Sequence, residues 1–284
     1  MKKPFIIGVL VFIGLLAGAY ALVVSNLSGP KVQGKRVVAW MDELASRETA
    51  IRDKAKETIL ANGKEFLPHL VAMMKAEDSE QRQKWATVLN VEHPPSYTLR
   101  LGAVRGFNVL GAAAAPVIPD LLPLLAVQDS GLDVAAAFGA IGKDAVTPLV
   151  QKLSDPNKQV RAMAAASLSR MKAGEATGAA DALIKGLQDE DGSVRSWMAT
   201  AVGKSQVSAE VAIPILITLL EDKDTSVVAS SASALGLYGP AAKEALPKLQ
   251  KLSKVRNEEI SGAAQNAVTL IAPEPEPEAK KASE

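Results

Sequence analysis

Residues 155–170 read DPNKQVRAMAAASLSR, and stretches with the same plan follow twice downstream. Residues 189–204 read DEDGSVRSWMATAVGK, and residues 222–237 read DKDTSVVASSASALGL. Equivalent positions lie 34 and then 33 residues apart, and Ile260 and Val268 begin a partial fourth copy another 33 residues on. Self-similarity at this period is typical of solenoids, in which each unit packs on its neighbours. We therefore expect a stacked array whose extended surface binds other molecules.

Each copy has the sequence features of a helical hairpin. Asp155, Pro156 and Asn157 form a turn that can cap a helix, and apolar residues at helical spacing follow it up to Leu168. A second apolar stripe ends at Leu187. Since neither helix buries its stripe alone, we predict antiparallel helix pairs that share one core. Three prolines fall early in the predicted second helices, where a missing N–H has no partner to lose: Pro148, Pro214 and Pro247.

The predicted fold class is all-α, a solenoid of antiparallel helix pairs over residues 50–271. An irregular helix, residues 80–91, follows the first pair, and a helix at residues 258–271 closes the array. Residues 31–49 are expected to form a linker and a first helix. In residues 272–284 Pro and Glu alternate, which predicts a disordered tail. The predicted pairs cover residues 50–76, 98–127, 131–154, 157–188, 192–221 and 225–254.

The start of the chain reads as a membrane segment. Residues 4–24, PFIIGVLVFIGLLAGAYALVV, contain no charge and are long enough to cross a hydrocarbon core of about 30 Å. A cleaved signal peptide is the alternative, because Ala19-Tyr20-Ala21 fits a cleavage site. The apolar run continues through residues 22–24, which favours an uncleaved anchor within residues 1–30.

The orientation of this anchor rests on the short amino terminus. Basic residues on the two sides of the segment are nearly balanced, and so short an amino terminus usually stays in the cytoplasm. We therefore expect a single-pass protein of a bacterial cytoplasmic membrane, with the solenoid on the periplasmic or extracytoplasmic side.

The composition excludes several function classes. Aromatic residues make up 4% of the chain and hydrophobic residues 48%, a balance that suits closely packed helices. Without Lys2 and Lys3 the chain carries 30 basic and 31 acidic residues, so it lacks the basic excess typical of nucleic-acid binding. Because there are no cysteines, disulfides, thiol catalysis, thiolate metal sites and lipoprotein acylation are excluded.

For the remaining candidate catalytic, metal-binding and partner-binding residues, we favour structural roles. His69 and His93 are the only histidines, and their settings fit neither a nucleophile–His–acid triad nor a zinc site. Four carboxylates could bind a hard cation but more simply cap helices: Asp189, Asp191, Asp222 and Asp224. The tryptophans are either binding anchors or core residues: Trp40, Trp85 and Trp197. We predict no enzyme activity, no cofactor, no catalytic residue and no metal site.

The order Asp-x-x-x-x-Val-Arg, alanines, Leu, a turn and a Pro-x-Leu helix resembles HEAT repeats, especially the short HEAT-like kind first associated with phycobilisome lyases. The resemblance covers roughly residues 50–271 and implies second helices that line a concave surface. Tetratricopeptide repeats share the period, but their Trp-Leu-Gly-Tyr pattern is missing. The resemblance also implies a structural ladder of acidic and basic residues along the stack: Asp155, Arg161, Asp189, Arg195 and Asp222, with Val228 where the next arginine would stand.

These observations lead to a membrane-anchored scaffold that binds an unknown protein or peptide. A lyase- or isomerase-like enzyme acting on a chromophore-bearing protein is the alternative, and nucleic-acid binding is disfavoured by the charge balance. Aligning the second helices superposes polar residues that we expect away from the core, on or near the concave side. The predicted partner-binding residues are Gln151, Lys152, Lys185, Gln250 and Lys251.

Overall fold

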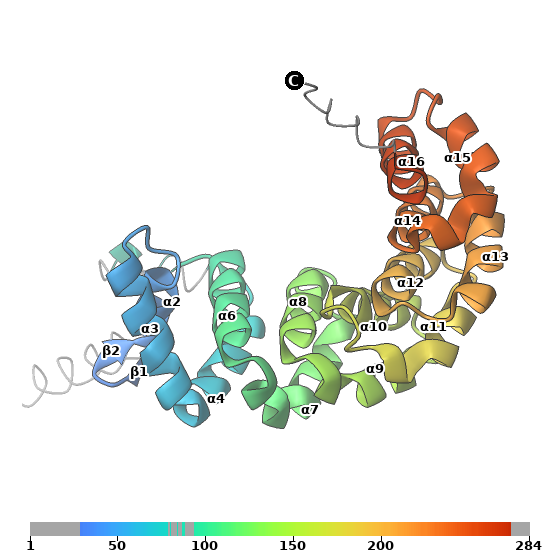
Figure 1. The fold of residues 1–284 in the computed structure, drawn as a ribbon. Coiled ribbons are helices and arrows are strands. Elements are labelled where there is room, and N and C mark those ends of the chain that lie inside the picture. Colours follow the sequence, from blue (N-terminus) through green and yellow to red (C-terminus); the bar gives the residue numbers. More distant parts are fainter. Residues whose placement is uncertain (1–28, 79, 81–83, 85–86, 89–93, 274–284) are drawn as a thin grey trace, which may run out of the picture. The chain divides into compact units, whose positions relative to one another are not determined.

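The computed structural model describes residues 29–78, 80, 84, 87–88 and 94–273, and these ranges are mostly helical (Figure 1). The chain divides into two compact units, Met1–Val117 and Ile118–Glu284. The predicted membrane segment, residues 4–24, lies outside the described residues, as do Trp85, His93 and nearly all of the predicted tail.

The N-terminal unit contains one short hairpin followed by helices. Their bounds are β1 (Lys31–Val32), β2 (Lys35–Arg36), α2 (Val37–Glu43), α3 (Thr49–Ala61), α4 (Gly63–Met74), α6 (Ser96–Leu110) and the 3₁₀ helix η1 (Gly111–Val117).

The β-hairpin was not predicted. Gln33 and Gly34 between its strands have φ values of 51° and 75°, the left-handed values that a two-residue hairpin turn requires. Trp40 holds the hairpin to α2, because its Nε1 donates to the carbonyl of Val32 at 3.0 Å and Lys35 Nζ lies 3.8 Å from its ring centroid. Trp40 is therefore a packing residue of the first helix.

The core of the N-terminal unit lies where α4 packs against α6. Phe66, Leu70 and Phe107 are fully buried there. A Cβ added at Gly106 would lie 2.7 Å from the Leu70 side chain, so a larger residue at that position would require this buried leucine to move.

One described stretch, Ser96–Ala126, is long and apolar enough to cross a membrane by length and composition alone. It is divided between α6 and the short helices that follow. Phe107, Leu110, Leu121 and Leu125 along it are buried.

The C-terminal unit is built from short helices in sequence. Their bounds are α7 (Ile118–Leu121), η2 (Leu122–Ala126), α8 (Gly131–Ile141), η3 (Gly142–Ala145), α9 (Val146–Lys152), α10 (Lys158–Arg170), η4 (Thr177–Ala179), α11 (Ala180–Gly186), α12 (Gly192–Ser205), α13 (Ala209–Leu219), α14 (Thr225–Leu237), η5 (Gly239–Ala245), α15 (Leu246–Leu252) and α16 (Glu258–Ile271).

These helices form two rows along a curved stack (Figure 1). The inner row is α8, α10, α12, α14 and α16, and each of these helices packs on the next. The outer row is α9, α11, α13 and α15. This stacking in chain order agrees with the predicted α-solenoid.

The pairing of the helices differs from the predicted one. Each outer helix packs against the inner helix that follows it, α9 on α10, α11 on α12, α13 on α14 and α15 on α16. Hairpins therefore begin one helix earlier than predicted, and the Asp-containing turn lies inside a hairpin. The outer helix is therefore the first helix of each pair. These outer helices are the ones with Pro-x-Leu sequences, and they lie on the convex side (Figure 1), so the expectation that they line the concave side was wrong.

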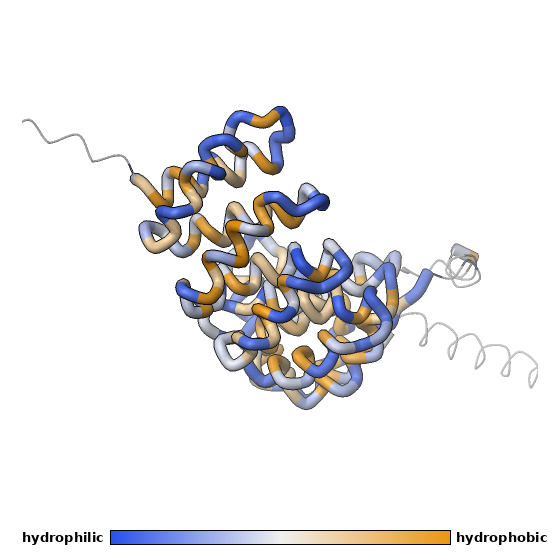
Figure 2. Tube along the Cα trace, turned by 90° about the vertical axis from the view of Figure 1, so that its right-hand side faces the viewer, coloured by the Kyte–Doolittle hydropathy of each residue, from blue (hydrophilic) through white to orange (hydrophobic). Residues whose placement is uncertain are grey.

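Small residues explain why neighbouring helices of the inner row pack more closely than those of the outer row. A Cβ added at Gly203 on α12 would lie 2.9 Å from the Cα of Ala234 on α14, and one added at Gly236 would lie 3.0 Å from the Cα of Ala267 on α16. Hydrophobic residues recur inside each helix, while hydrophilic residues gather at the turns (Figure 2). Close approach on one side of the stack curves it toward that side.

Pro214 lies deeper in its helix than predicted, and Pro68 lies at the same depth in α4. Pro68 is the sixth residue of α4 and Pro214 the sixth residue of α13. Both residues are exposed. Since each faces solvent, water can satisfy the backbone carbonyl that the missing N–H leaves without a partner.

Candidate binding surface

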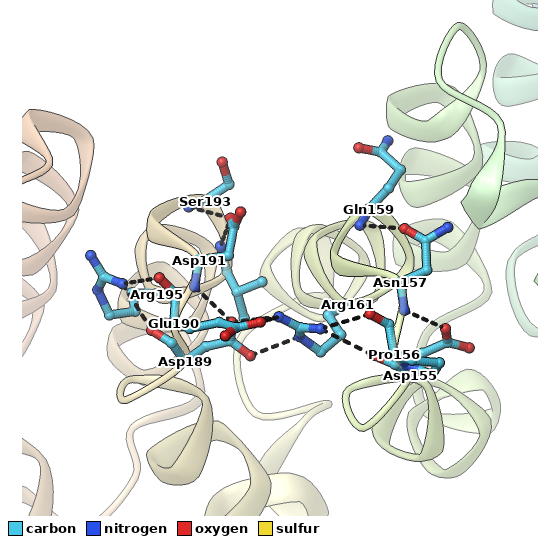
Figure 3. Close-up of polar contacts among 11 residues, drawn as sticks. Asp155, Pro156, Asn157, Gln159, Arg161, Asp189, Glu190, Asp191, Ser193 and Arg195 are labelled. Atoms are coloured by element: carbon cyan, nitrogen blue, oxygen red, sulfur yellow. Dashed lines mark hydrogen bonds and ion pairs between the residues drawn. The ribbon is translucent and has the colours of Figure 1, made fainter.

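Arg161 connects two successive turns of the stack (Figure 3). Its Nη1 donates to the backbone carbonyls of Asp155 and Pro156 in its own turn, at 3.1 and 3.4 Å. Its Nε and Nη2 donate to the carboxylate of Asp189 in the next turn, at 2.9 and 3.1 Å, and Nη2 also reaches Glu190 Oε1 at 2.9 Å. The hydrogen bonds that Arg161 donates to Asp189 raise the pKa of Arg161, and its side chain bonds within the stack rather than to solvent.

Arg195 repeats this arrangement one unit later. Its Nη1 donates to the carbonyls of Asp189 and Glu190, at 2.8 and 3.1 Å. Its Nε and Nη2 donate to the two oxygens of Asp222, both at 2.8 Å, and Nη2 reaches Asp224 Oδ2 at 2.9 Å. The side chains of Arg195 and Asp222 are each only 9% exposed. Asp189 therefore connects the two arginines, because its carboxylate accepts from Arg161 and its backbone carbonyl accepts from Arg195.

The pKa of Asp222 follows from this contact. Burial by itself would raise the pKa, but the hydrogen bonds from Arg195 and from the backbone N–H of Asp224, together with the positive charges of Arg195 and Lys223, outweigh burial, and the net pKa is lowered. The carboxylate therefore stays ionised within the turn.

An apolar contact takes over where the next arginine is missing. Val228 stands at the position equivalent to Arg195. It is 4% exposed and clusters with Ala229 and with Ile260 of α16, and Leu252 packs against this cluster. A valine needs no acidic partner, so the contact between the last two units is apolar.

The candidate cation-binding carboxylates have structural partners. Asp191 caps α12 by accepting from the backbone N–H of Ser193 at 2.9 Å. Asp189 and Asp222 each accept from the backbone N–H two residues on, both at 2.9 Å. Within the described ranges, no group of three His, Cys, Asp or Glu residues is placed to hold a metal ion.

The N-terminal unit contains a related contact that was not predicted from the sequence. Arg100 on α6 donates to the carbonyl of Ala76 at 3.2 Å and to the hydroxyl of Ser96 at 3.0 Å. Asp78 accepts from the Ser96 backbone N–H and hydroxyl, at 2.8 and 2.9 Å. The sequence did not reveal this contact because 17 residues separate Asp78 from Ser96, far more than separate the aspartates from the helices in the later turns.

The predicted partner-binding residues all lie on outer-row helices. They comprise Gln151 and Lys152 on α9, Lys185 on α11, and Gln250 and Lys251 on α15. Lys152 is partly buried and pairs with Asp155 Oδ2 at 3.4 Å, whereas the other four are exposed. Their helices face away from the concave side (Figure 1). Their role in binding stays a prediction.

The solvent-facing stripe of the inner helices provides a second surface, here called the inner face. Each of α10, α12 and α14 is packed by inner helices on both sides and by an outer helix behind it, so its remaining stripe faces the concave side. Equivalent positions on the inner face of α10, α12, α14 and α16 form three rows: Arg170, Lys204, Leu237 and Leu270; Ala166, Thr200, Ser233 and Asn266; Met163, Trp197, Ser230 and Ala263.

The rows change character along the stack. On α10 the inner-face positions Met163 and Ala166 are both buried and offer little exposed side chain. On α14 and α16 it presents leucines, since Leu237 is 49% exposed and Leu270 is 53% exposed. A bound segment would therefore meet cations near α10 and α12 and apolar side chains farther along.

Arg170, Trp197 and Lys204 form the cationic end of the inner face. The Arg170 guanidinium lies 5.1 Å from the Trp197 ring centroid, a cation–π arrangement. Lys204 Nζ donates to the carbonyl of Ser169 at 2.7 Å, near the end of α10. Burial lowers the pKa of both cations, and the charge of Arg170 lowers that of Lys204 further.

Comparison with known proteins identifies part of this architecture. The family model described as HEAT repeats matches residues 180–269. These residues form a HEAT-repeat array. No curated protein matches the chain significantly.

Solved structures similar to the chain include other helical-repeat proteins. The karyopherin Kap121p, solved bound to the extreme C-terminus of the phosphatase Cdc14p, is 17% identical with a TM-score of 0.52, over 83% of this chain and 29% of that chain. Importin beta is 14% identical with a TM-score of 0.47, over 83% of this chain and 41% of that chain. A computationally designed armadillo repeat protein for modular peptide recognition is 19% identical with a TM-score of 0.42, over 84% and 100%. The karyopherin match shows the α-solenoid fold.

The HEAT-repeat array contributes α12, α14 and α16 to the inner face, and α10 directly precedes it. The arrangement offers hydrogen-bond donors, hydroxyl groups, one ring and two exposed leucines. These groups suit non-covalent binding of a chain segment.

Proposed function

We propose that this chain is a membrane-anchored scaffold that binds a segment of another protein along the inner face of its C-terminal unit, without catalysis. The observation that carries the proposal is the inner face itself. Three rows of equivalent positions recur from one inner helix to the next, and on α12, α14 and α16 they present polar, aromatic and apolar side chains that are partly or fully exposed. An extended ligand can contact successive helices in the same way, which is how repeat surfaces bind chains.

The fold similarity supports a protein partner. The karyopherin with the similar solenoid was solved with the C-terminal segment of another protein bound to it. A peptide segment is therefore the class of partner that we propose here.

Site-specific photo-crosslinking tests this proposal in native membranes. A benzoylphenylalanine replaces Thr200 or Ser233 on the inner face, and Lys185 or Gln250 on the outer row serves as the matched control. We expect discrete crosslinked adducts from the inner positions. Adducts only from the outer positions would move the site to the residues predicted from sequence, and no adduct from any position would overturn the binding function.

We also propose that residues 4–24 anchor the protein in a bacterial cytoplasmic membrane with the solenoid outside the cytoplasm. The uncharged run of these residues supports the anchor, and the short amino terminus before it supports the orientation. Because the chain has no cysteine, Lys185→Cys introduces a single thiol at an exposed position. A membrane-impermeant maleimide should label it in spheroplasts as strongly as after permeabilisation. Labelling only after permeabilisation would reverse the orientation.

A further inference from the structure

The two cations of the inner face, Arg170 and Lys204, lie close together without an ion-paired acid in the part of the chain that the structure describes. Arg170 and Lys204 are both partly buried and close enough for the charge of one to lower the pKa of the other. The charge of Asp133 raises the pKa of Arg170, and that of Glu175 raises the pKa of Lys204, but neither contribution outweighs burial. Among the residues that the structure describes, no carboxylate forms an ion pair with either cation.

Most of their hydrogen-bonding capacity is also unused within the described chain. Arg170 makes one side-chain hydrogen bond, a long 3.5 Å contact from Nη1 to the carbonyl of Ala166. A guanidinium has five N–H donors and an ammonium has three. Lys204 uses one of its donors on the carbonyl of Ser169. The Trp197 ring holds the guanidinium in place, which lowers the entropy lost when an anion binds.

The same row continues into leucines. Gly203 and Gly236 lie beneath Leu237 and Leu270, because a Cβ at either glycine would lie 3.1 or 3.2 Å from the corresponding leucine Cδ1. Neighbouring helices are about 8–10 Å apart, so two helix steps separate the cation pair from the leucine pair by about 20 Å. An extended peptide rises about 3.3 Å per residue, and about six residues cover that distance.

We propose that the inner face binds an extended acidic peptide, with its carboxylates at Arg170 and Lys204 and large apolar side chains about six residues away at Leu237 and Leu270. This inference rests on the proposed function and specifies the partner's chemistry. The carboxylates satisfy the free donors and relieve the repulsion between the two cations. The leucines cover apolar surface that is otherwise exposed.

Fluorescence anisotropy with the full chain in detergent micelles tests the proposal. The probes are fluorescein-labelled Glu-Glu-Ser-Ser-Ser-Ser-Leu-Leu and the same residues in reverse order, and the control probes carry Gln for Glu. We expect at least one Glu peptide to bind about tenfold or more tightly than its Gln counterpart, because hydrogen bonds to charged groups are the stronger ones. Raising the salt concentration should weaken that binding. Equal affinities for the Glu and Gln peptides would overturn the inference without any change in the protein.

Protein variants locate the site. Arg170→Gln with Lys204→Gln should weaken Glu-peptide binding roughly tenfold or more, and Leu237→Ser with Leu270→Ser should also weaken it. Lys185→Gln with Lys251→Gln removes the same charge from the outer row and should leave affinity unchanged. Circular dichroism checks that each variant is folded.

The outcomes separate this inference from the scaffold function. Crosslinks at Thr200 or Ser233 together with no preference for the Glu peptides would reject the acidic partner and keep the scaffold. Loss of Glu-peptide binding in the outer-row variant alone would reject the inner-face site.

Discussion

Arg195 links the turn before α12 to the turn before α14. It donates to two backbone carbonyls behind it and to two carboxylates ahead of it. Because Arg195 and Asp222 are almost fully buried, each is needed to satisfy the other. Removing one member of such a buried pair destabilises the protein mainly because the other member is left as an unpaired buried charge.

We expect Arg195→Ala to lower the free energy of unfolding by about 3–5 kcal/mol, because it leaves Asp222 as an uncompensated buried charge. Urea denaturation followed by circular dichroism measures the change. The double variant Arg195→Ala with Asp222→Ala should lose less than the sum of the two single variants. Additive losses would mean that the two side chains do not depend on each other.

The lowered pKa of Asp222 predicts an acid-dependent stability. A carboxyl whose folded pKa lies below its unfolded value, about 3.9, contributes stability that is present above that value and is lost as pH falls through the folded pKa. Below about pH 4 the wild-type chain should therefore lose more stability than Asp222→Asn. Urea midpoints between pH 6 and pH 2.5 compare the two, and parallel profiles would contradict the prediction.

At the scale of the element, the inner helices depend on small residues at their contacts. Gly203 approaches the backbone of Ala234, which cannot rotate away as a flexible side chain would. Gly262 on α16 has no atom within 4 Å of an added Cβ. The two glycines are thus a matched pair, one closely packed and one free.

Gly203→Ala should destabilise the chain by about 1–3 kcal/mol through overpacking, although alanine is the better helix former. Gly262→Ala should stabilise it by about 0.5–1 kcal/mol through helix propensity alone. Thermal denaturation of both variants gives the signs. Equal and stabilising effects would mean that α12 and α14 are not as close as described.

At the scale of the whole molecule, the C-terminal unit is a stack whose last helix covers the helix before it. α16 packs on α14 and α15 and buries Val228 and Ala229 together with Ile260. Terminal units of repeat arrays serve as caps for this reason. Residues 273–284, in contrast, are rich in Pro and Glu and contain no apolar stripe.

Truncation after Asn257 should lower the melting temperature, because it exposes the apolar face of α14. Truncation after Ala272 removes only the Pro- and Glu-rich end and should leave the melting temperature unchanged. Differential scanning calorimetry of the two truncations tests both statements. A large drop on removing residues 273–284 alone would show that they pack on the body.

The solenoid could be predicted because its period appears in the order of residues. The candidate binding surface could not, since it depends on which helices face inward. Lys185 and Lys251 look like exposed binding residues in the sequence and are exposed, but on the outer row. Arg170 and Lys204 look like ordinary ends of helices, and only packing brings their charges together and places Arg170 beside Trp197.

By itself the sequence determined that the chain is a repeated series of helices with an uncharged first segment, because period, helical spacing and hydropathy are properties of neighbouring residues. Tertiary structure alone decided which helix pairs with which, which row is concave and which cations meet. Those outcomes depend on how closely helices approach, and the approach depends on contacts such as Gly203 with Ala234 between residues of different repeats.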